Sequence, residues 1–449
     1  MQPKRFMKTL LSAVALTLLI SGCSLFPSGS GGGSTYTDPF APEDVVDGMF
    51  YTVNEEEGYA VFNGIYDNLA FNEAYRNANR FEVRSEYKGY PVRVILDNAL
   101  TDGNCASIEE IAIPSSVKSI GFRAFRSCRN VTKIVFNEGL EAIGEEAFYE
   151  YGNERRVEFT LPSTLKKIGN SALPCSTQTL VMPPRIEELG NGCLKYNTFD
   201  ELYLPGTLKE LGADVFAQAR ARYLHMSDEI TTLPENAFEA IQGVETIHLS
   251  NALTILPKKT FHWMNDETGM SDPVEITGGE SIEEIHSEAC NVPSIRYFPY
   301  SNVLRNISGE NSLYYVKNRN FPDSLRSISA TAFHSAADNT PGHYPSQIGY
   351  VPDNLFARVQ FDQTDIEIHL SNQSSIGEYS FANSNLTKVT IDAYNFEIKR
   401  GAFSNCSDLE QIYFTDTMSI FRNTRKGEDW NKGVKATCVH CSDGDLYFD

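Results

Sequence analysis

The sequence predicts a repeat solenoid: a parallel β-sheet of short strands, with a short second strand and a one-turn helix in each rung and a cap at both ends. Two observations predict it. Residues 108–128 read IEEIAIPSSVKSIGFRAFRSC, and their apolar, glycine and aromatic positions return at residues 131–148 and then almost to the C-terminus. Self-similarity at a period of about 20–25 residues is typical of solenoids, whose single repeats bury no core of their own.

Each repeat divides into three pieces. Ile134 and Phe136 alternate with Val135, which predicts a first strand with two inward side chains. A second short extended piece follows, and it ends at glycines that we expect to permit a corner; these are Gly121, Gly144, Gly169, Gly190 and Gly212. The third piece, such as residues 123–128, predicts about one helical turn in which a small alanine lets the coils stack.

One large residue in the third piece marks each copy and is expected to fill the centre of the coil. The marker residues are Leu100, Phe125, Phe148, Leu173, Leu194, Phe216, Phe238, Phe261, Cys290, Phe333, Phe356, Phe381 and Phe403, with a degenerate copy near Leu313. A polar insert at residues 262–273, which contains Trp263, lengthens the step between two markers. Insertions of this kind map to loops, often on a binding face.

This pattern resembles the BspA-like leucine-rich repeat family of bacterial surface proteins, whose consensus is LxxIxIPxxVxxIGxxAFxxC over about 23 residues. The resemblance covers residues 95–414, about 14 repeats of the leucine-rich-repeat type. Residues 87–92 resemble the family's lead-in to the first repeat, and residues 438–446 are similar to its closing strand. Membership would imply adhesion to host or matrix proteins, or to other bacteria.

The N-terminus predicts export. Lys4, Arg5 and Lys8 precede an apolar run at residues 10–20, which is typical of a signal peptide and too short for a stable membrane span. The following Ile-Ser-Gly-Cys resembles a bacterial lipobox, which implies cleavage after residue 22 and lipidation of Cys23. An ordinary secretory signal with an incidental cysteine is the alternative. Lipidation would anchor the chain in the membrane on the extracytoplasmic face of the cell envelope.

The expected domains follow from these segments. Residues 1–22 are the lipoprotein signal peptide, 23–44 a lipidated flexible tether rich in glycine and serine, and 45–94 an N-terminal cap. Residues 95–414 form the solenoid, and 415–449 the C-terminal cap. No second hydrophobic span follows in the sequence, so the lipid would be the membrane attachment.

Charge limits the partners. The chain of 449 residues carries 59 acidic and 38 basic side chains, a formal net charge of −21. Such a surface repels phosphate, so we expect no nucleic-acid partner. A negatively charged surface of this kind favours partners with cationic groups.

Polar and aromatic side chains gather at one outward position of successive first strands. Tyr203, His225, His248 and Glu275 are expected to form a column, because neighbouring strands lie about 4.8 Å apart. A solvated polar ladder, a contact patch for a partner and a metal site are the three interpretations. With Trp263 of the insert, these four residues are the candidate partner-binding residues.

Cys438 and Cys441, with His440 between them, suggest zinc or redox chemistry at first sight. Zinc normally takes four ligands, and no second such motif lies nearby in the sequence. A redox CxxC normally opens a helix, whereas this pair falls in an expected cap strand. We therefore favour structural thiols or a disulfide, and expect no metal and no cofactor.

Catalytic motifs are absent from the sequence: it contains no nucleophile elbow, P-loop, HExxH or helix-opening GxGxxG. We expect a non-catalytic, lipid-anchored surface protein that binds a protein or glycan partner, in the manner of an adhesin. The alternative is a structural protein of the envelope without a dedicated ligand.

Overall fold

The computed structural model describes residues 45–66, 68–75, 78–100, 105, 107–126, 128–149, 156–264, 273–333 and 341–448. The expected signal peptide, the tether and Cys23 lie outside these residues. The chain divides into two units, the first comprising residues 1–200 and 207–220 and the second residues 201–206 and 221–449. In the described part, no helix is long and apolar enough to cross a membrane.

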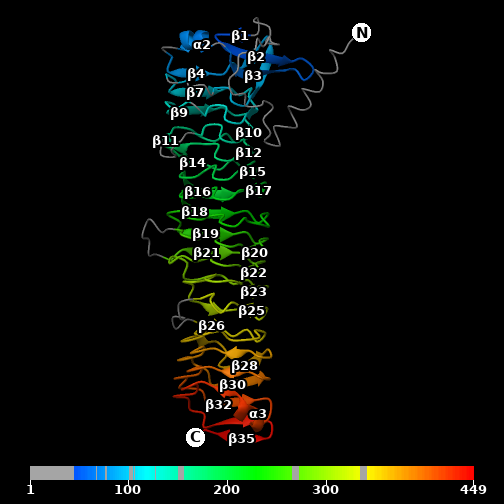
Figure 1. Ribbon diagram of the computed structural model, residues 1–449, viewed down its shortest axis with the longest axis vertical. Helices are drawn as coiled ribbons and strands as arrows, with labels where there is room; N and C mark the ends of the chain where they lie inside the picture. The colour runs from blue at the N-terminus through cyan, green and yellow to red at the C-terminus, as the bar shows by residue number, and fades with distance from the viewer. Residues whose placement is uncertain are drawn as a thin grey trace, which may run out of the picture. The chain divides into compact units, whose positions relative to one another are not determined.

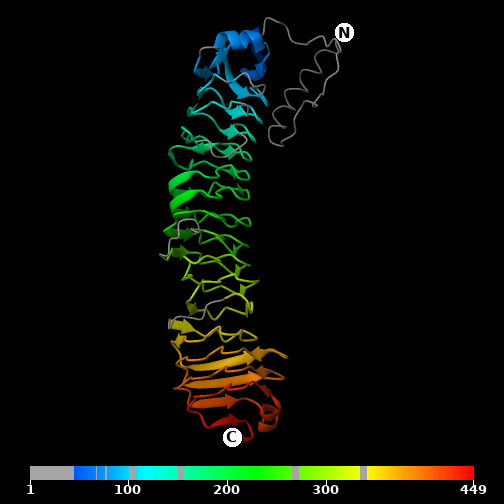
Figure 2. The same cartoon turned by 60° about the vertical axis from the view of Figure 1, so that its left-hand side comes forward.

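The fold is a parallel β-solenoid of about 14 turns with few helices, as the repeat predicts. Each coil carries a first strand, a second strand and a turn segment. Figures 1 and 2 show the coils of each unit stacked along the chain, from blue to green in the first and from green to red in the second. Alternating apolar side chains point into the coil, because successive residues of a strand face opposite sides.

The first unit opens with an antiparallel sheet and a helix. Here β1 (Val45–Val46) pairs with β2 (Met49–Asn54), and β2 with β3 (Tyr59–Ile65), all antiparallel. Helix α2 (Asn68–Tyr75) and strands β4 (Arg80–Glu82) and β5 (Glu86–Tyr87) follow. Strand β6 (Tyr90–Ile95) pairs in parallel with β3 and with β8 (Ser119–Ile120), which is the second strand of the first repeat. It therefore joins the antiparallel start to the parallel solenoid.

The repeats of the first unit form two strand series. The first strands are β7 (Glu110–Ile113), β9 (Lys133–Phe136), β11 (Arg156–Val157), β13 (Cys175–Ser176), β14 (Thr179–Leu180) and β16 (Thr198–Leu204), whose last residues belong to the second unit. The second strands are β8 (Ser119–Ile120), β10 (Ala142–Ile143), β12 (Lys167–Ile168), β15 (Glu188–Leu189) and β17 (Glu210–Leu211). Consecutive second strands from β8 to β17 pair with one another in parallel.

The second unit repeats the scheme. Its first strands are β18 (Arg220–Met226, which starts at the last residue of the first unit), β19 (Thr246–Leu249), β21 (Glu275–Gly278), β24 (Arg319–Asn320), β26 (Pro341–His343), β27 (Gln360–Phe361), β28 (Asp365–Leu370), β30 (Lys388–Ala393) and β32 (Gln411–Phe414). Its second strands are β20 (Ile255–Leu256), β22 (Glu284–Ile285), β23 (Asn306–Ile307), β25 (Ser327–Ile328), β29 (Ser375–Ile376), β31 (Glu397–Ile398) and β33 (Arg425–Lys426).

A hairpin ends the chain. Helix α3 (Met418–Asn423) follows β32, and β34 (Cys438–Cys441) pairs with β32 in parallel. Strand β35 (Gly444–Tyr447) then turns back antiparallel to β34, so the last coil meets an antiparallel edge. Trp430 packs edge-on against Phe403 at a centroid distance of 6.3 Å, which covers the aromatic core at this end.

The turn segments carry the aromatic core. Phe381 and Phe403, on adjacent coils, stack with centroids 5.2 Å apart and planes at 3°, and Phe125 and Phe148 stack at 5.0 Å. Such pairs contribute about 0.5–1.5 kcal/mol each beyond the burial of their area. The expected helical turn is realised as i→i−3 hydrogen bonds, but it begins with a left-handed residue, such as Arg123 at φ 53°.

The repeat glycines serve a different purpose from the one expected. Gly121, Gly144 and Gly169 have no left-handed φ, so they are not needed for a corner. A Cβ on Gly144 would lie 2.6 Å from the carbonyl carbon of Gly121, and one on Gly169 2.7 Å from that of Gly144. Close approach of consecutive coils therefore requires glycine at this position.

Candidate binding face on the first strands of the second unit

A column of polar and aromatic side chains runs along the first strands of the second unit. Strand register pairs His225 of β18 with His248 of β19, and His248 with Thr277 of β21. Tyr203, near the end of β16, stands beside His225. Figure 1 shows β18, β19 and β21 one above the other in this order. We call Tyr203, His225, His248 and Thr277 the ring column.

Ring contacts connect the column. The centroids of Tyr203 and His225 lie 5.3 Å apart, and those of His225 and His248 lie 4.7 Å apart. His248 Nδ1 lies 3.0 Å from Thr277 Oγ1, a hydrogen bond that orients the imidazole. Tyr203 is 39% exposed. His225 and His248 are half-buried. The column is therefore a partly solvent-exposed row of side chains in contact, and not a set of independent side chains.

Glu275 does not belong to this column, contrary to the expectation from the sequence. It pairs with Thr246, so Thr277 takes the place beside His248. Aligning the repeats by their apolar residues misplaces this strand, because Gly278 stands opposite Leu249 at a position where an apolar residue is expected. Gly278 has φ 76°, and a Cβ there would lie 2.1 Å from the Leu249 oxygen. Glu275 stays on the same face of the sheet, two residues before Thr277.

Charged groups border the ring column. The pKa of Asp228 is lowered, first by the Asn251 backbone N–H that its carboxylate accepts at 2.9 Å, and to a smaller extent by His248 and His225. Beside the column, Arg222 pairs with Glu245 at 3.0 Å and lies over the ring of Tyr223. The face thus offers aromatic rings with charges of both signs at its edge.

Trp263 lies on another side of the coil. It belongs to the turn segment after β20, where it is 57% exposed and stacks on His262 with centroids 4.6 Å apart. His262 is buried, with its two ring nitrogens 3.4 Å from Glu239 and from Glu288 of the neighbouring coils. The structure therefore does not bring Trp263 onto the strand face of the ring column, and the remainder of the insert, residues 265–272, lies outside the described part.

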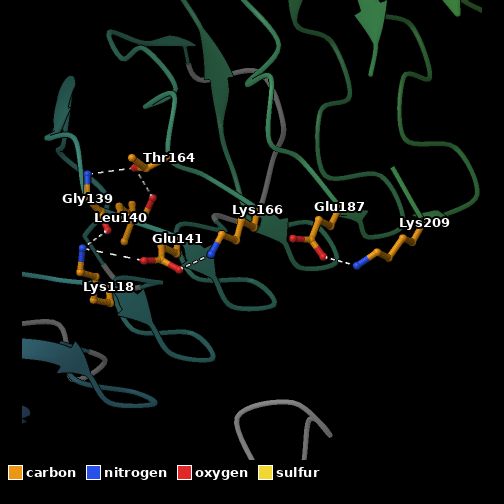
Figure 3. Close-up of polar contacts among 8 residues, drawn as sticks. All are labelled: Lys118, Gly139, Leu140, Glu141, Thr164, Lys166, Glu187 and Lys209. Carbon is orange, nitrogen blue, oxygen red and sulfur yellow. Dashed lines mark hydrogen bonds and ion pairs between the residues drawn. The ribbon is translucent and has the colours of Figure 1, made fainter. Parts of the chain in front are cut away.

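The second-strand side of the first unit has a different character. Figure 3 shows Lys118, Glu141 and Lys166 in a row, with Glu141 2.7 Å from Lys166 and 3.8 Å from Lys118. Glu187 and Lys209 continue the alternation with a 2.6 Å ion pair. Hydrogen bonding from Lys166 lowers the pKa of Glu141. Opposite charges on consecutive coils therefore neutralise one another along this row.

The cysteine motif lies on the closing hairpin. Cys438 and Cys441 are both free thiols, and the strand alternation puts them on opposite faces of β34. Burial raises the pKa of both thiols, and nearby aspartates raise it further. A redox cysteine needs the opposite shift. The thiols therefore do not have the properties of a redox pair, whereas Cys438 and His440 share one face with Asp445.

The architecture is that of a leucine-rich-repeat solenoid. The sequence profile of the BspA type leucine rich repeat region matches residues 95–222, 187–315 and 310–425. This chain belongs to that family of BspA-type leucine-rich repeat proteins. No protein with a curated description matches the chain.

Solved structures of similar repeats include three from bacteria. A leucine-rich repeat protein from Bacteroides ovatus is 19% identical over 87% of this chain and 91% of its own, with a TM-score of 0.41. A leucine rich cell surface protein from Faecalibacterium prausnitzii is 16% identical over 91% and 99%, with a TM-score of 0.32. The pneumococcal vaccine antigen PcpA is 14% identical over 87% and 97%, with a TM-score of 0.37.

Proposed function

We propose that this protein is a lipid-anchored, non-catalytic protein of the bacterial cell surface, and that it binds a protein or glycan partner through the ring column. The observation that carries the proposal is the contact series from the exposed Tyr203 through the half-buried His225 to the half-buried His248. Aromatic side chains supply large contact area at low conformational cost, which is why they dominate interaction surfaces.

The chemistry of the face indicates the kind of partner. Tyrosine and imidazole rings stack on flat apolar surfaces, such as sugar faces or the side chains of arginine and aromatic residues, and their polar atoms accept or donate hydrogen bonds. The net charge of −21 favours a partner with cationic groups. A basic protein segment or a glycan fits these conditions better than an acidic polymer does.

The anchor follows from the sequence of the N-terminal segment. Lipidation of Cys23, followed by the Gly/Ser-rich residues up to 44, would hold the folded part at a distance from the membrane. An anchored repeat protein of this kind meets its partner at the extracytoplasmic surface. Adhesion is the role that this combination supports best.

An envelope protein without a dedicated ligand is the second candidate. The paired charges of Lys118, Glu141 and Lys166 favour it, because a surface that satisfies itself needs no partner. The ring column favours the first candidate, because its rings contact one another on a face that no other element covers in the described structure, with Tyr203 exposed and the two histidines half-buried.

A binding screen separates the two. Soluble residues 36–449 are immobilised and exposed to matrix proteins, basic peptides and envelope glycans, and saturable binding is measured by surface plasmon resonance. A binder whose affinity falls when the ring column is replaced supports the adhesin. Absence of any saturable binder, together with normal growth of a deletion strain, leaves the envelope protein.

A further inference from the structure

The closing hairpin brings together three side chains of metal-ligating type. Cys438 and His440 are two residues apart in β34, so both project from the same face of the strand. The antiparallel register places Asp445 of β35 directly opposite His440. Val439 and Leu446 form the neighbouring pair of the register, and Val439 is buried in the coil. The other face of the hairpin therefore carries a thiol, an imidazole and a carboxylate, of which the Cys438 thiol is buried.

The distances suit one small cation. His440 Nδ1 lies 2.7 Å from Asp445 Oδ1 and 4.0 Å from Cys438 Sγ, and one ligand atom from each residue falls within 4.8 Å of the other two. In tetrahedral zinc sites, ligand atoms at 2.0–2.3 Å from the metal are separated by about 3.3–3.6 Å. Side-chain rotation closes this difference, because the hairpin already holds the three backbones in place.

The donor set indicates the metal. A thiolate, an imidazole and a carboxylate are ligands that zinc accepts, whereas calcium and magnesium prefer oxygen alone. The thiolate and the carboxylate together carry two negative charges, which match a divalent cation. The side chains of His440 and Asp445 are 35% and 43% exposed, so a fourth position faces solvent. Three protein ligands with a fourth position left to water differ from structural zinc sites, in which the protein supplies all four ligands.

The ring of Tyr413 limits movement of the imidazole. Register pairs Tyr413 of β32 with His440, and their ring centroids lie 4.9 Å apart. His440 is thus held between an aromatic neighbour and the carboxylate of Asp445. Cys441 points to the other face of β34 and contacts the backbone oxygen of Val439, so it is not part of the group.

We infer that Cys438, His440 and Asp445 form a three-ligand site for Zn²⁺ on the C-terminal hairpin. On binding, the S–H bond of Cys438 breaks, a sulfur–metal bond forms and the proton passes to solvent. The site does not depend on the ring column, and it adds a metal-dependent element to the end of the chain. Bound metal would join β34 to β35 by a second connection besides their backbone hydrogen bonds.

Cobalt titration of the full chain in detergent tests the site, because Co²⁺ reports thiolate ligation by a charge-transfer band in the near ultraviolet. We expect one equivalent of Co²⁺ to give the band and Zn²⁺ to displace it. Asp445→Asn should weaken binding by at least about tenfold, and Cys438→Ser should remove the band. Cys441→Ser is the matched control and should bind as the unchanged chain does.

Two results would overturn the inference: no charge-transfer band in the unchanged chain at excess Co²⁺, or a band that Cys441→Ser removes while Asp445→Asn retains it. The second result would indicate chelation by the two cysteines. Thermal unfolding of each metal-free variant shows whether it folds. If Cys438→Ser does not fold, the exposed Asp445→Asn still decides between the outcomes.

Discussion

The imidazole rings of His225 and His248 lie with their centroids 4.7 Å apart, although one whole repeat of the chain separates the two residues. They are neighbours because β18 and β19 run parallel in register, so that equivalent positions of consecutive coils stand side by side. Each ring projects from the sheet, while Leu224 and Ile247 next to them are buried. The buried residues of the strands thus set the positions of the two rings, and the rings themselves are not part of the core.

Replacing Tyr203, His225 and His248 together with alanine should weaken partner binding while the fold persists. Their neighbours in the strands supply the core, and exposed substitutions of this kind change the free energy of unfolding by less than about 0.5 kcal/mol each. Binding is measured by surface plasmon resonance, and stability by thermal unfolding. A large loss of stability would show that the rings support the fold.

The sheet formed by β28, β30, β32, β34 and β35 offers a matched control for this triple variant. Glu367, Thr390 and Tyr413 occupy equivalent outward positions of β28, β30 and β32. Alanine at these three positions should leave binding to the ring column unchanged. Equal weakening by both triple variants would indicate a general effect on the solenoid and would contradict a localised binding face.

Gly144→Ala should destabilise the first unit by about 2–3 kcal/mol, because the new Cβ would lie 2.6 Å from the Gly121 carbonyl carbon. Gly89→Ala separates packing from backbone strain: Gly89 has φ 82°, and its Cβ would have no atom within 4 Å. Gly89→Ala should lower the free energy of unfolding by about 1–2 kcal/mol, which is the cost of a left-handed backbone for alanine. Thermal unfolding measures both, and a smaller effect at Gly144 than at Gly89 would refute the close-approach explanation.

His343 should make stability depend on pH. Its Nε2 lies 2.9 Å from Asp323 and its Nδ1 3.4 Å from Asp362. Burial alone would lower the pKa of His343, but hydrogen bonds and charge from the two carboxylates outweigh it and raise the pKa above 6.5. A raised histidine pKa stabilises the fold below the unfolded-state pKa, and this contribution is lost as pH rises through the folded-state pKa.

His343→Gln should therefore cost more stability at about pH 5.5 than at about pH 8.5. Thermal unfolding at the two pH values gives the difference, and NMR titration gives the pKa of His343 directly. Asp323→Asn is the control, because removing one carboxylate should lower that pKa. An equal cost of His343→Gln at both pH values would contradict the ion pair.

Cys23→Ser should abolish lipidation, because the acyl groups need the sulfur and the new amino group at this residue. The variant should no longer incorporate labelled palmitate. Serine replacement of Cys441, which lies on the closing hairpin, is the matched control and should leave labelling intact. Palmitate labelling of Cys23→Ser at the normal level would show that the N-terminal segment is an ordinary secretory signal.

Much of the fold was predictable from periodicity. The alternation at Ile134 and Phe136, and the recurring large residue at positions such as Phe381, are local patterns that any parallel coil must satisfy. The purpose of the repeat glycines was not predictable in the same way. A glycine needed for close approach of another coil and a glycine needed for a left-handed φ are the same letter in a sequence, and only the neighbouring coil distinguishes them.

The sequence by itself determined the solenoid and which strand positions face outward, because burial alternates along each strand and repeats with each coil. Only the tertiary structure decided which outward residues meet. It put Thr277 beside His248 in place of Glu275, since Gly278 shifts the apolar pattern of that strand. It also placed Asp445 beside His440, since the hairpin register supplies a ligand that no spacing motif contains. Contacts between coils depend on register, and register depends on packing across the whole repeat.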